Sequence, residues 1–268
     1  MTLTRKEFQG HPFHLVDLSP WPLFQVVSLL ILGGSALAYF QGITNSLLSL
    51  ILGFITWLSV MGLWFRDVSS EGTFMGNHTS KVQGSLNIGF SLFVVSEIFF
   101  FISIFWAFFH SALAPTVELG CTWPPLGIVS IDPFAIPILN TILLLSSGAF
   151  ITYAHHGMVY SNRVLFIIGT VITLILAFAF TALQGVEYID APFTINDSVA
   201  GSVFFFGTGF HGIHIIIGSI FIIVSLSRIL YYHNTTSHMV GLDSAILYWH
   251  FVDVVWLFLY VFFYWWSA

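Results

Sequence analysis

The chain has 268 residues, of which 57% are hydrophobic and 7% charged, and its mean hydropathy is +0.94. A soluble domain carries about 25% charged residues, so this composition excludes a water-soluble globular protein and predicts one helical bundle immersed in lipid. The formal net charge of −6 identifies no partner, because the side of the membrane on which each charge lies matters more than the sum. The single cysteine, Cys121, excludes an internal disulfide and a multi-cysteine metal site.

Seven long apolar segments follow one another along the chain, and each is close to the roughly 20 residues that a membrane helix needs. In chain order they are Leu23–Gln41, Ser46–Phe65, Leu86–Phe109, Phe134–His156, Val164–Gln184, Val199–Arg228 and Ala245–Trp266. The sixth has no charged residue between Asp197 and Arg228 and, at about 1.5 Å per residue, exceeds the ~30 Å hydrocarbon layer, so we expect it to tilt or project. The sequence therefore predicts an all-α polytopic membrane protein with seven transmembrane helices.

The basic residues indicate how these helices are oriented. All six fall on the same side of the predicted membrane, at Arg5, Lys6, Arg66, Lys81, Arg163 and Arg228. The opposite loops have no Lys or Arg and carry Glu118, Asp132, Glu187, Asp190 and Asp197. The positive-inside rule then places the amino terminus inside and the carboxyl terminus outside, which requires an odd number of spans. The opening residues lack a small-residue cleavage site and a transit-peptide pattern, so we expect no removable targeting segment.

A polar segment rich in Gly and Ser separates the second and third apolar segments. Such a composition favours a seam between two groups of helices. We therefore expect an amino-terminal segment with a two-helix group in residues 1–66, a polar linker in 67–84 and a five-helix group in 85–268.

Eleven histidines in a membrane protein first suggest haem or copper ligation. Bundles that hold haem between facing helices often place two histidines about 13 residues apart on one helix, but no two histidines here are separated by 13 or 14 residues. Most of them lie at segment ends or in loops, so we expect this chain to bind no metal and no redox cofactor. The seven segments also contain no lysine, which excludes a retinal Schiff base.

Glu97 is the sharpest feature, because it lies about twelve residues into the third segment, among apolar neighbours. A carboxylate near the membrane midplane costs several kcal/mol unless it is protonated, hydrated or paired, so Glu97 is a candidate functional residue by default. Asp253 in the seventh segment is similar, with His250 three residues earlier on the same helix face. With His211 and His214 these residues predict a buried polar cluster that is either a proton-linked or headgroup-binding site or an interhelical clamp that fixes packing.

Two arginines stand at segment ends on the basic side, where a phospholipid phosphate would be paired. Arg66 follows the interfacial Trp64, and Arg228 precedes His233. Both are candidate lipid-binding residues, although they would stand at the same places if they only set the topology.

The carboxyl-terminal sequence Tyr248-Trp249-His250-Phe251-Val252-Asp253 closely resembles the last helix of the third-subunit family of cytochrome c oxidase. The resemblance extends over essentially the whole chain. It includes His11-Pro12-Phe13-His14, Trp64-Phe65-Arg66-Asp67, Ser96-Glu97, Phe105-Trp106-Ala107-Phe108-Phe109-His110, Trp123-Pro124-Pro125, Ala154-His155-His156, Glu187-Tyr188, Ala191-Pro192-Phe193-Thr194 and Thr208-Gly209-Phe210-His211.

This resemblance implies seven helices arranged as two plus five around a cleft that holds phospholipids. It implies a noncatalytic core subunit that stabilises the catalytic subunit and supports reduction of oxygen to water coupled to proton translocation. Glu97 matches the family's carboxylate that reacts with hydrophobic carbodiimides, and Arg66, His78 and Arg228 match positions near lipid headgroups.

The resemblance also implies where the cofactors and partners lie. Haem a, haem a3 and copper are expected in partner subunits, and this chain is expected to hold structural phospholipids alone. The expected partners are the haem- and copper-bearing catalytic subunit, the second and supernumerary oxidase subunits and a respiratory supercomplex, with no nucleic acid. The expected location is the mitochondrial inner membrane, with the amino terminus on the matrix side and the carboxyl terminus on the intermembrane-space side.

Two other classes of function remain open at this point. A free-standing proton-linked transporter would use Glu97 and Asp253, although such transporters often have broken helices, which these uninterrupted segments do not suggest. A pure assembly scaffold would have no functional use for Glu97.

Overall fold

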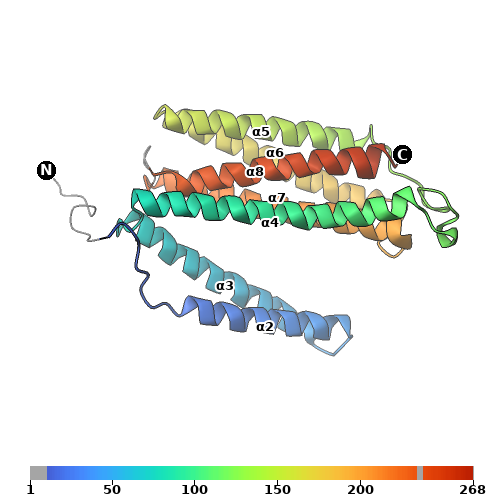
Figure 1. Cartoon of the computed structure of the whole chain (residues 1–268), viewed down its shortest axis with the longest axis horizontal. Helices are drawn as coiled ribbons and strands as arrows, with labels where there is room; N and C mark the ends of the chain where they lie inside the picture. Colours follow the sequence, from blue (N-terminus) through green and yellow to red (C-terminus); the bar gives the residue numbers. More distant parts are fainter. Residues whose placement is uncertain (1–10, 234–237, 268) are drawn as a thin grey trace. The chain divides into compact units, whose positions relative to one another are not determined.

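The computed structural model describes residues 11–233 and 238–267, which form a helical protein (Figure 1). Within these residues seven helices are long and apolar enough to cross a membrane. They are α2 (Trp21–Phe40), α3 (Ser46–Thr73), α4 (Ser80–Leu113), α5 (Ile136–Val159), α6 (Arg163–Asp190), α7 (Ser198–Leu230) and α8 (Val240–Leu259), the last continued by the π-helical segment η2 (Tyr260–Trp265). The prediction of an all-α, seven-span membrane protein is confirmed.

Several helices are longer than the apolar segments that predicted them. Helix α3 continues to Thr73, beyond the predicted end at Phe65, and α4 begins at Ser80 rather than at Leu86. Between these two helices only residues 74–79 are not helical, so most of the stretch 67–84, which the sequence suggested was linker, is helix. A helix that leaves the hydrocarbon layer can continue with polar side chains, because water and headgroups solvate them there.

The chain divides into two compact units, the first ending at Ser85 and the second beginning at Leu86. In the first unit α2 and α3 pack along each other and are linked near one end by a hydrogen bond of 2.6 Å from Trp21 Nε1 to Asp67 Oδ2. The prediction of a lipid-holding cleft between a two-helix and a five-helix group stays a prediction.

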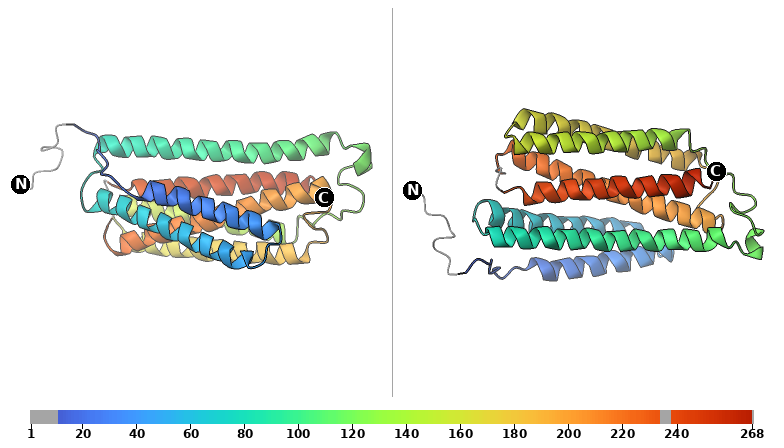
Figure 2. Two further views of the ribbon diagram at one scale, coloured as in Figure 1. Left: turned by 90° about the horizontal axis from the view of Figure 1, so that it is seen from below. Right: turned by 45° about the horizontal axis from the view of Figure 1, so that its top comes forward.

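The second unit contains most of α4 and all of α5 to α8. Helices α5 and α6 lie side by side (Figures 1 and 2), and a Cβ atom on Gly169 of α6 would lie 2.9 Å from both the Ala154 Cβ and the Phe150 carbonyl oxygen of α5. The core of the second unit is built from large side chains, among which Trp249, Trp256 and Tyr264 are almost fully buried. This tight packing fixes the positions of the polar side chains described below.

The predicted orientation rests on charges that the structure only partly describes. Arg5 and Lys6 lie outside the described residues. At one end of the second unit the Arg163 Nη2 donates to the Leu230 carbonyl oxygen at 2.7 Å, so the start of α6 and the end of α7 lie together there. Which compartment this end faces stays a prediction.

Candidate functional site

Glu97 lies near the middle of the span Ser80–Leu113 and pairs with His214 of α7. The distance from Glu97 Oε2 to His214 Nε2 is 2.9 Å, and the other ring nitrogen, Nδ1, lies 2.7 Å from the Phe210 carbonyl oxygen. A carbonyl oxygen only accepts, so Nδ1 carries a proton, and a neutral imidazole then presents a lone pair to Glu97. One further proton must lie between the ring and the carboxyl group, either on the acid or on the imidazole.

Aromatic rings surround this pair and shield it from water. The ring centroid of His214 lies 5.0 Å from that of Phe101 and 6.2 Å from that of Tyr248. The His214 side chain is only 9% exposed, whereas that of Glu97 is 23% exposed. Glu97 is therefore the more accessible member of the pair.

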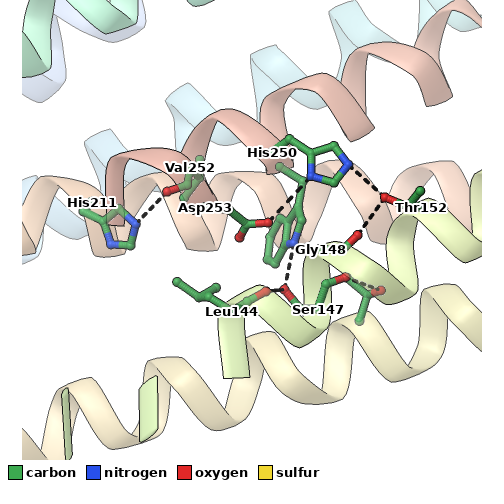
Figure 3. Close-up of polar contacts among 10 residues, drawn as sticks. Leu144, Ser147, Gly148, Thr152, His211, His250, Val252 and Asp253 are labelled. Atoms are coloured by element: carbon green, nitrogen blue, oxygen red, sulfur yellow. Dashed lines mark hydrogen bonds and ion pairs between the residues drawn. The ribbon is translucent and has the colours of Figure 1, made fainter. Parts of the chain in front are cut away.

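A second pair joins His250 and Asp253 on α8 (Figure 3). The His250 Nδ1 lies 3.8 Å from the Asp253 Oδ2, and its Nε2 lies 3.2 Å from the Thr152 hydroxyl of α5. The sequence indicated this pair, because an i, i+3 spacing places two side chains on one helix face.

His211 forms a third, separate group. Its Nε2 donates to the Val252 carbonyl oxygen at 3.2 Å, its ring packs against Trp256 at 5.1 Å and Phe180 at 5.8 Å, and the residue is 1% exposed. No hydrogen bond or ion pair joins it to Glu97 or Asp253 within the part of the chain that the structure describes. The residues expected as one polar cluster therefore form three groups, which share no hydrogen bond or ion pair within the described residues.

The sequence missed a fourth buried polar group at the carboxyl-terminal end of α6. Glu187 was expected in a loop, but it lies in the helix and is 3% exposed. Tyr264 donates to its Oε1 at 2.5 Å, Gln184 donates to the same oxygen at 3.1 Å, and Asn140 of α5 reaches Gln184 at 3.4 Å. Nothing local in the sequence indicates this network, because Tyr264 lies 77 positions away.

The headgroup candidates of the first unit lie around the end of α3. Arg66 is exposed and its Nη2 pairs with Asp67 at 2.8 Å, while Trp64 is half-buried. The half-buried His78 lies against Gly72, where a Cβ atom would approach the ring to 2.7 Å. Arg66 therefore presents a partly neutralised charge at the surface, where a phosphate would have to compete with Asp67.

Arg228 belongs to the last turn of α7, and its guanidinium group lies beside the start of α8. A Cβ atom on Gly241 would lie 3.1 Å from its Nη1, so the glycine leaves room for the guanidinium group. The half-buried His238 lies near it, and burial together with the positive charge of Arg228 lowers the pKa of the imidazole below its ordinary value. Arg228 is therefore the positive group of this corner, beside an imidazole whose neutral form is favoured.

Among residues 11–233 and 238–267, no three His, Cys, Asp or Glu side chains are grouped so that they could hold a metal ion. That the haems and copper belong to other subunits stays a prediction.

Seven helices long and apolar enough to span a membrane, with Glu97 of α4 paired to His214 of α7, define a multi-pass membrane protein. Residues 11–268 match the model of the family described as cytochrome c oxidase subunit III. Proteins named cytochrome c oxidase subunit 3 are 57% identical in Mycosarcoma maydis (99% of this chain and 98% of the relative), 58% in Rhizopus stolonifer (99% and 94%) and 54% in Yarrowia lipolytica (100% of both). The chain belongs to the cytochrome c oxidase subunit III family.

Proposed function

We propose that this chain is the noncatalytic third core subunit of cytochrome c oxidase in the mitochondrial inner membrane. In that role it supports reduction of oxygen to water and proton translocation by stabilising the catalytic subunit and by holding phospholipids. Haem a, haem a3 and copper then lie in partner subunits. The observation that carries this proposal is the family match, which runs from residue 11 to residue 268.

The surface of the chain supports a role inside a larger membrane assembly. Large apolar side chains such as Phe99, Trp106 and Ile175 are more than half exposed. Lipid tails or the helices of partner subunits must cover such side chains, because water does not solvate them well. The subunit thus offers apolar area to its neighbours in a membrane assembly.

The decisive experiment is co-purification of the tagged full-length chain from its native membrane. We expect the haem- and copper-bearing catalytic subunit to accompany it, and we expect the complex to keep its haem and copper content per catalytic subunit after this chain is removed. Loss of a haem or of copper along with the chain would contradict the noncatalytic role.

Glu97 supports a proton-linked contribution to that role, because its pair with His214 holds one proton near the middle of a span. In the purified oxidase, Glu97→Gln is expected to reduce turnover or shorten the period over which turnover persists. Ser103→Ala, which removes a hydroxyl that bonds only within α4, is the matched control. Unchanged turnover and durability in Glu97→Gln would instead indicate a pure scaffold.

The lipid-holding role is proposed for the positive corner around Arg228 and for Arg66 with Trp64 and His78. Arg228→Gln and Arg66→Gln are each expected to lower the phospholipid phosphorus that remains with the delipidated complex. Arg163→Gln is the control, since that guanidinium group already donates to the Leu230 carbonyl oxygen and lies over the Tyr232 ring at 3.7 Å. Equal phosphorus in all three variants would contradict the proposed headgroup sites.

The comparisons do not favour the alternative of a free-standing proton-linked transporter. Its two acids, Glu97 and Asp253, belong to different pairs in different parts of the bundle. The alternative predicts proton-coupled uptake by the isolated chain in liposomes, and we expect none.

A further inference from the structure

A polar group near the middle of α5 and α8 has no part in the proposed function. Asp253 and Gly148 lie near the centres of the spans Val240–Trp265 and Ile136–Val159. A Cβ atom on Gly148 would lie 2.6 Å from the Asp253 Oδ2, so only glycine leaves room for this carboxyl group. Asp253 is 7% exposed, while the His250 side chain in front of it is 41% exposed (Figure 3).

The hydrogen-bond directions determine which nitrogen of His250 carries a proton. The Thr152 hydroxyl has one proton and donates it to the Gly148 carbonyl oxygen at 2.8 Å. It can therefore only accept from His250, so the proton lies on Nε2, at 3.2 Å from the hydroxyl oxygen. A neutral imidazole then has a lone pair on Nδ1, and this nitrogen faces the Asp253 Oδ2 at 3.8 Å.

An ionised Asp253 beside a neutral His250 would place two lone pairs face to face. The second carboxyl oxygen, Oδ1, is buried and has no hydrogen-bond partner within the described residues. Trp249 Nε1, a donor four residues earlier on the same helix, donates to the Ser147 hydroxyl at 3.0 Å. An uncompensated carboxylate at this depth is strongly unfavourable, so the geometry requires one more proton.

Other titratable groups around the pair do not supply that proton. Helix α7 contributes His211, bound to the Val252 carbonyl oxygen, and His214, bound to Glu97. At the basic end of the bundle His155 of α5 pairs with Asp243 of α8 at 3.2 Å, and Tyr248 packs on His214. Among the described residues of the second unit, the two arginines lie at helix ends, Arg163 at the start of α6 and Arg228 in the last turn of α7.

We propose that His250 and Asp253 form a second proton-binding site of this chain, separate from Glu97 and His214, which holds one shared proton at neutral pH. The proton lies on the carboxyl group or on Nδ1, and in both forms the pair is neutral as a whole. Thr152 is a positioning residue that fixes the tautomer, and Gly148 admits the carboxyl group. The exposed edge of His250 is where a donor or acceptor outside the chain exchanges this proton.

The test is infrared spectroscopy of the full chain, purified with the subunits that accompany it and labelled with 13C in aspartate. At neutral pH we expect a label-sensitive band of a protonated carboxyl group, or ring bands of an imidazolium. Asp253→Asn should remove the carboxyl band or return the ring bands to those of a neutral imidazole. Thr152→Val, which keeps both members of the pair, should shift whichever signal is present.

The matched control is Ser147→Ala, which removes the hydroxyl that binds Trp249 in the turn beside Gly148 and leaves the pair intact. Its spectrum should match that of the unchanged chain. An ionised aspartate together with a neutral imidazole at neutral pH would overturn the proposal. So would a proton-carrying signal that survives unchanged in Asp253→Asn and Thr152→Val.

Discussion

The two compact units bury their helices to very different degrees. In the most apolar 18-residue stretch of each helix, 6% of the residues are buried in α2 and 11% in α3. The share is 39% in α5, α6 and α7, and 56% in the last span. In α2 and α3 the buried positions are serines and glycines, while the second unit buries tryptophan, tyrosine and phenylalanine together with His211, His214 and Asp253. Small residues let two helices approach in lipid, and only the larger bundle can shield polar groups between its helices.

The largest effect on stability is expected for a glycine at which two helix backbones meet. Gly169→Ala should lower the free energy of unfolding of the second unit by about 3 kcal/mol, because the new Cβ would meet backbone and Cβ atoms of α5 at 2.9 Å. Gly33→Ala in α2 is the control, since nothing lies within 4 Å of its Cβ position. Denaturation of the purified complex followed by circular dichroism measures both variants. Equal losses of stability would contradict the difference in packing between the two units.

The Glu187 network should give the next largest effect. Tyr264→Phe removes the donor at 2.5 Å from a buried carboxyl oxygen, so we expect a loss of about 2 kcal/mol, within the usual range for hydrogen bonds to such groups. Tyr231→Phe changes an exposed hydroxyl and should cost almost nothing. The same denaturation experiment measures the stability of both variants. A Tyr264→Phe variant as stable as Tyr231→Phe would show that the Glu187 network contributes no stability.

Hydroxyl groups give a paired comparison between the units. The Thr141 hydroxyl accepts a hydrogen bond of 3.0 Å from Trp256 Nε1 across the second unit, and Thr56 in α3 bonds only to carbonyl oxygens of its own helix. Thr141→Val should cost about 1 kcal/mol, as interhelical hydrogen bonds in membranes do. Thr56→Val should change stability by less than the error of the measurement, and the reverse order would contradict the contrast drawn between the units.

The sequence predicts the spans because span length and apolarity are local properties. It fails at the helix ends of α3 and α4, where polar residues remain helical beyond the hydrocarbon layer, so hydropathy does not mark the end. Glu97 could be found as a lone acid in an apolar segment, and His250 with Asp253 by their spacing. The partner of Glu97 could not be singled out, because His214 is 117 positions away and only packing brings it near. Glu187 was missed for the same reason.

A smaller effect is expected where α2 and α3 are linked in the first unit. Trp21→Phe removes the hydrogen bond of 2.6 Å to Asp67. Because Asp67 still accepts a hydrogen bond from Arg66, the loss of unfolding free energy should stay below about 1 kcal/mol. Trp57→Phe in the middle of α3, whose indole contacts the Phe54 ring and makes no hydrogen bond within the described residues, is the control. Protease cleavage near residues 41–45 should rise slightly in Trp21→Phe alone. A strong rise would mean that this end contact, rather than small-residue packing, holds the first unit together.

The smallest effect concerns charge at the end of the second unit. Burial, and after it the positive charge of Arg228, lower the pKa of His238 below 6.5, so the folded protein binds this proton less tightly than the unfolded chain does. Stability from this group is therefore present above pH 6.5 and is lost as the pH falls through that value toward the lower folded-state pKa. Arg228→Gln should raise the pKa of His238 but leave it below the ordinary value, because burial remains. Arg163→Gln, which keeps Arg228, should leave the pKa where it is. Nuclear magnetic resonance of the protein with isotope-labelled histidine measures this titration. An unchanged pKa in Arg228→Gln would mean that the guanidinium charge is already neutralised, as it would be by a bound phosphate.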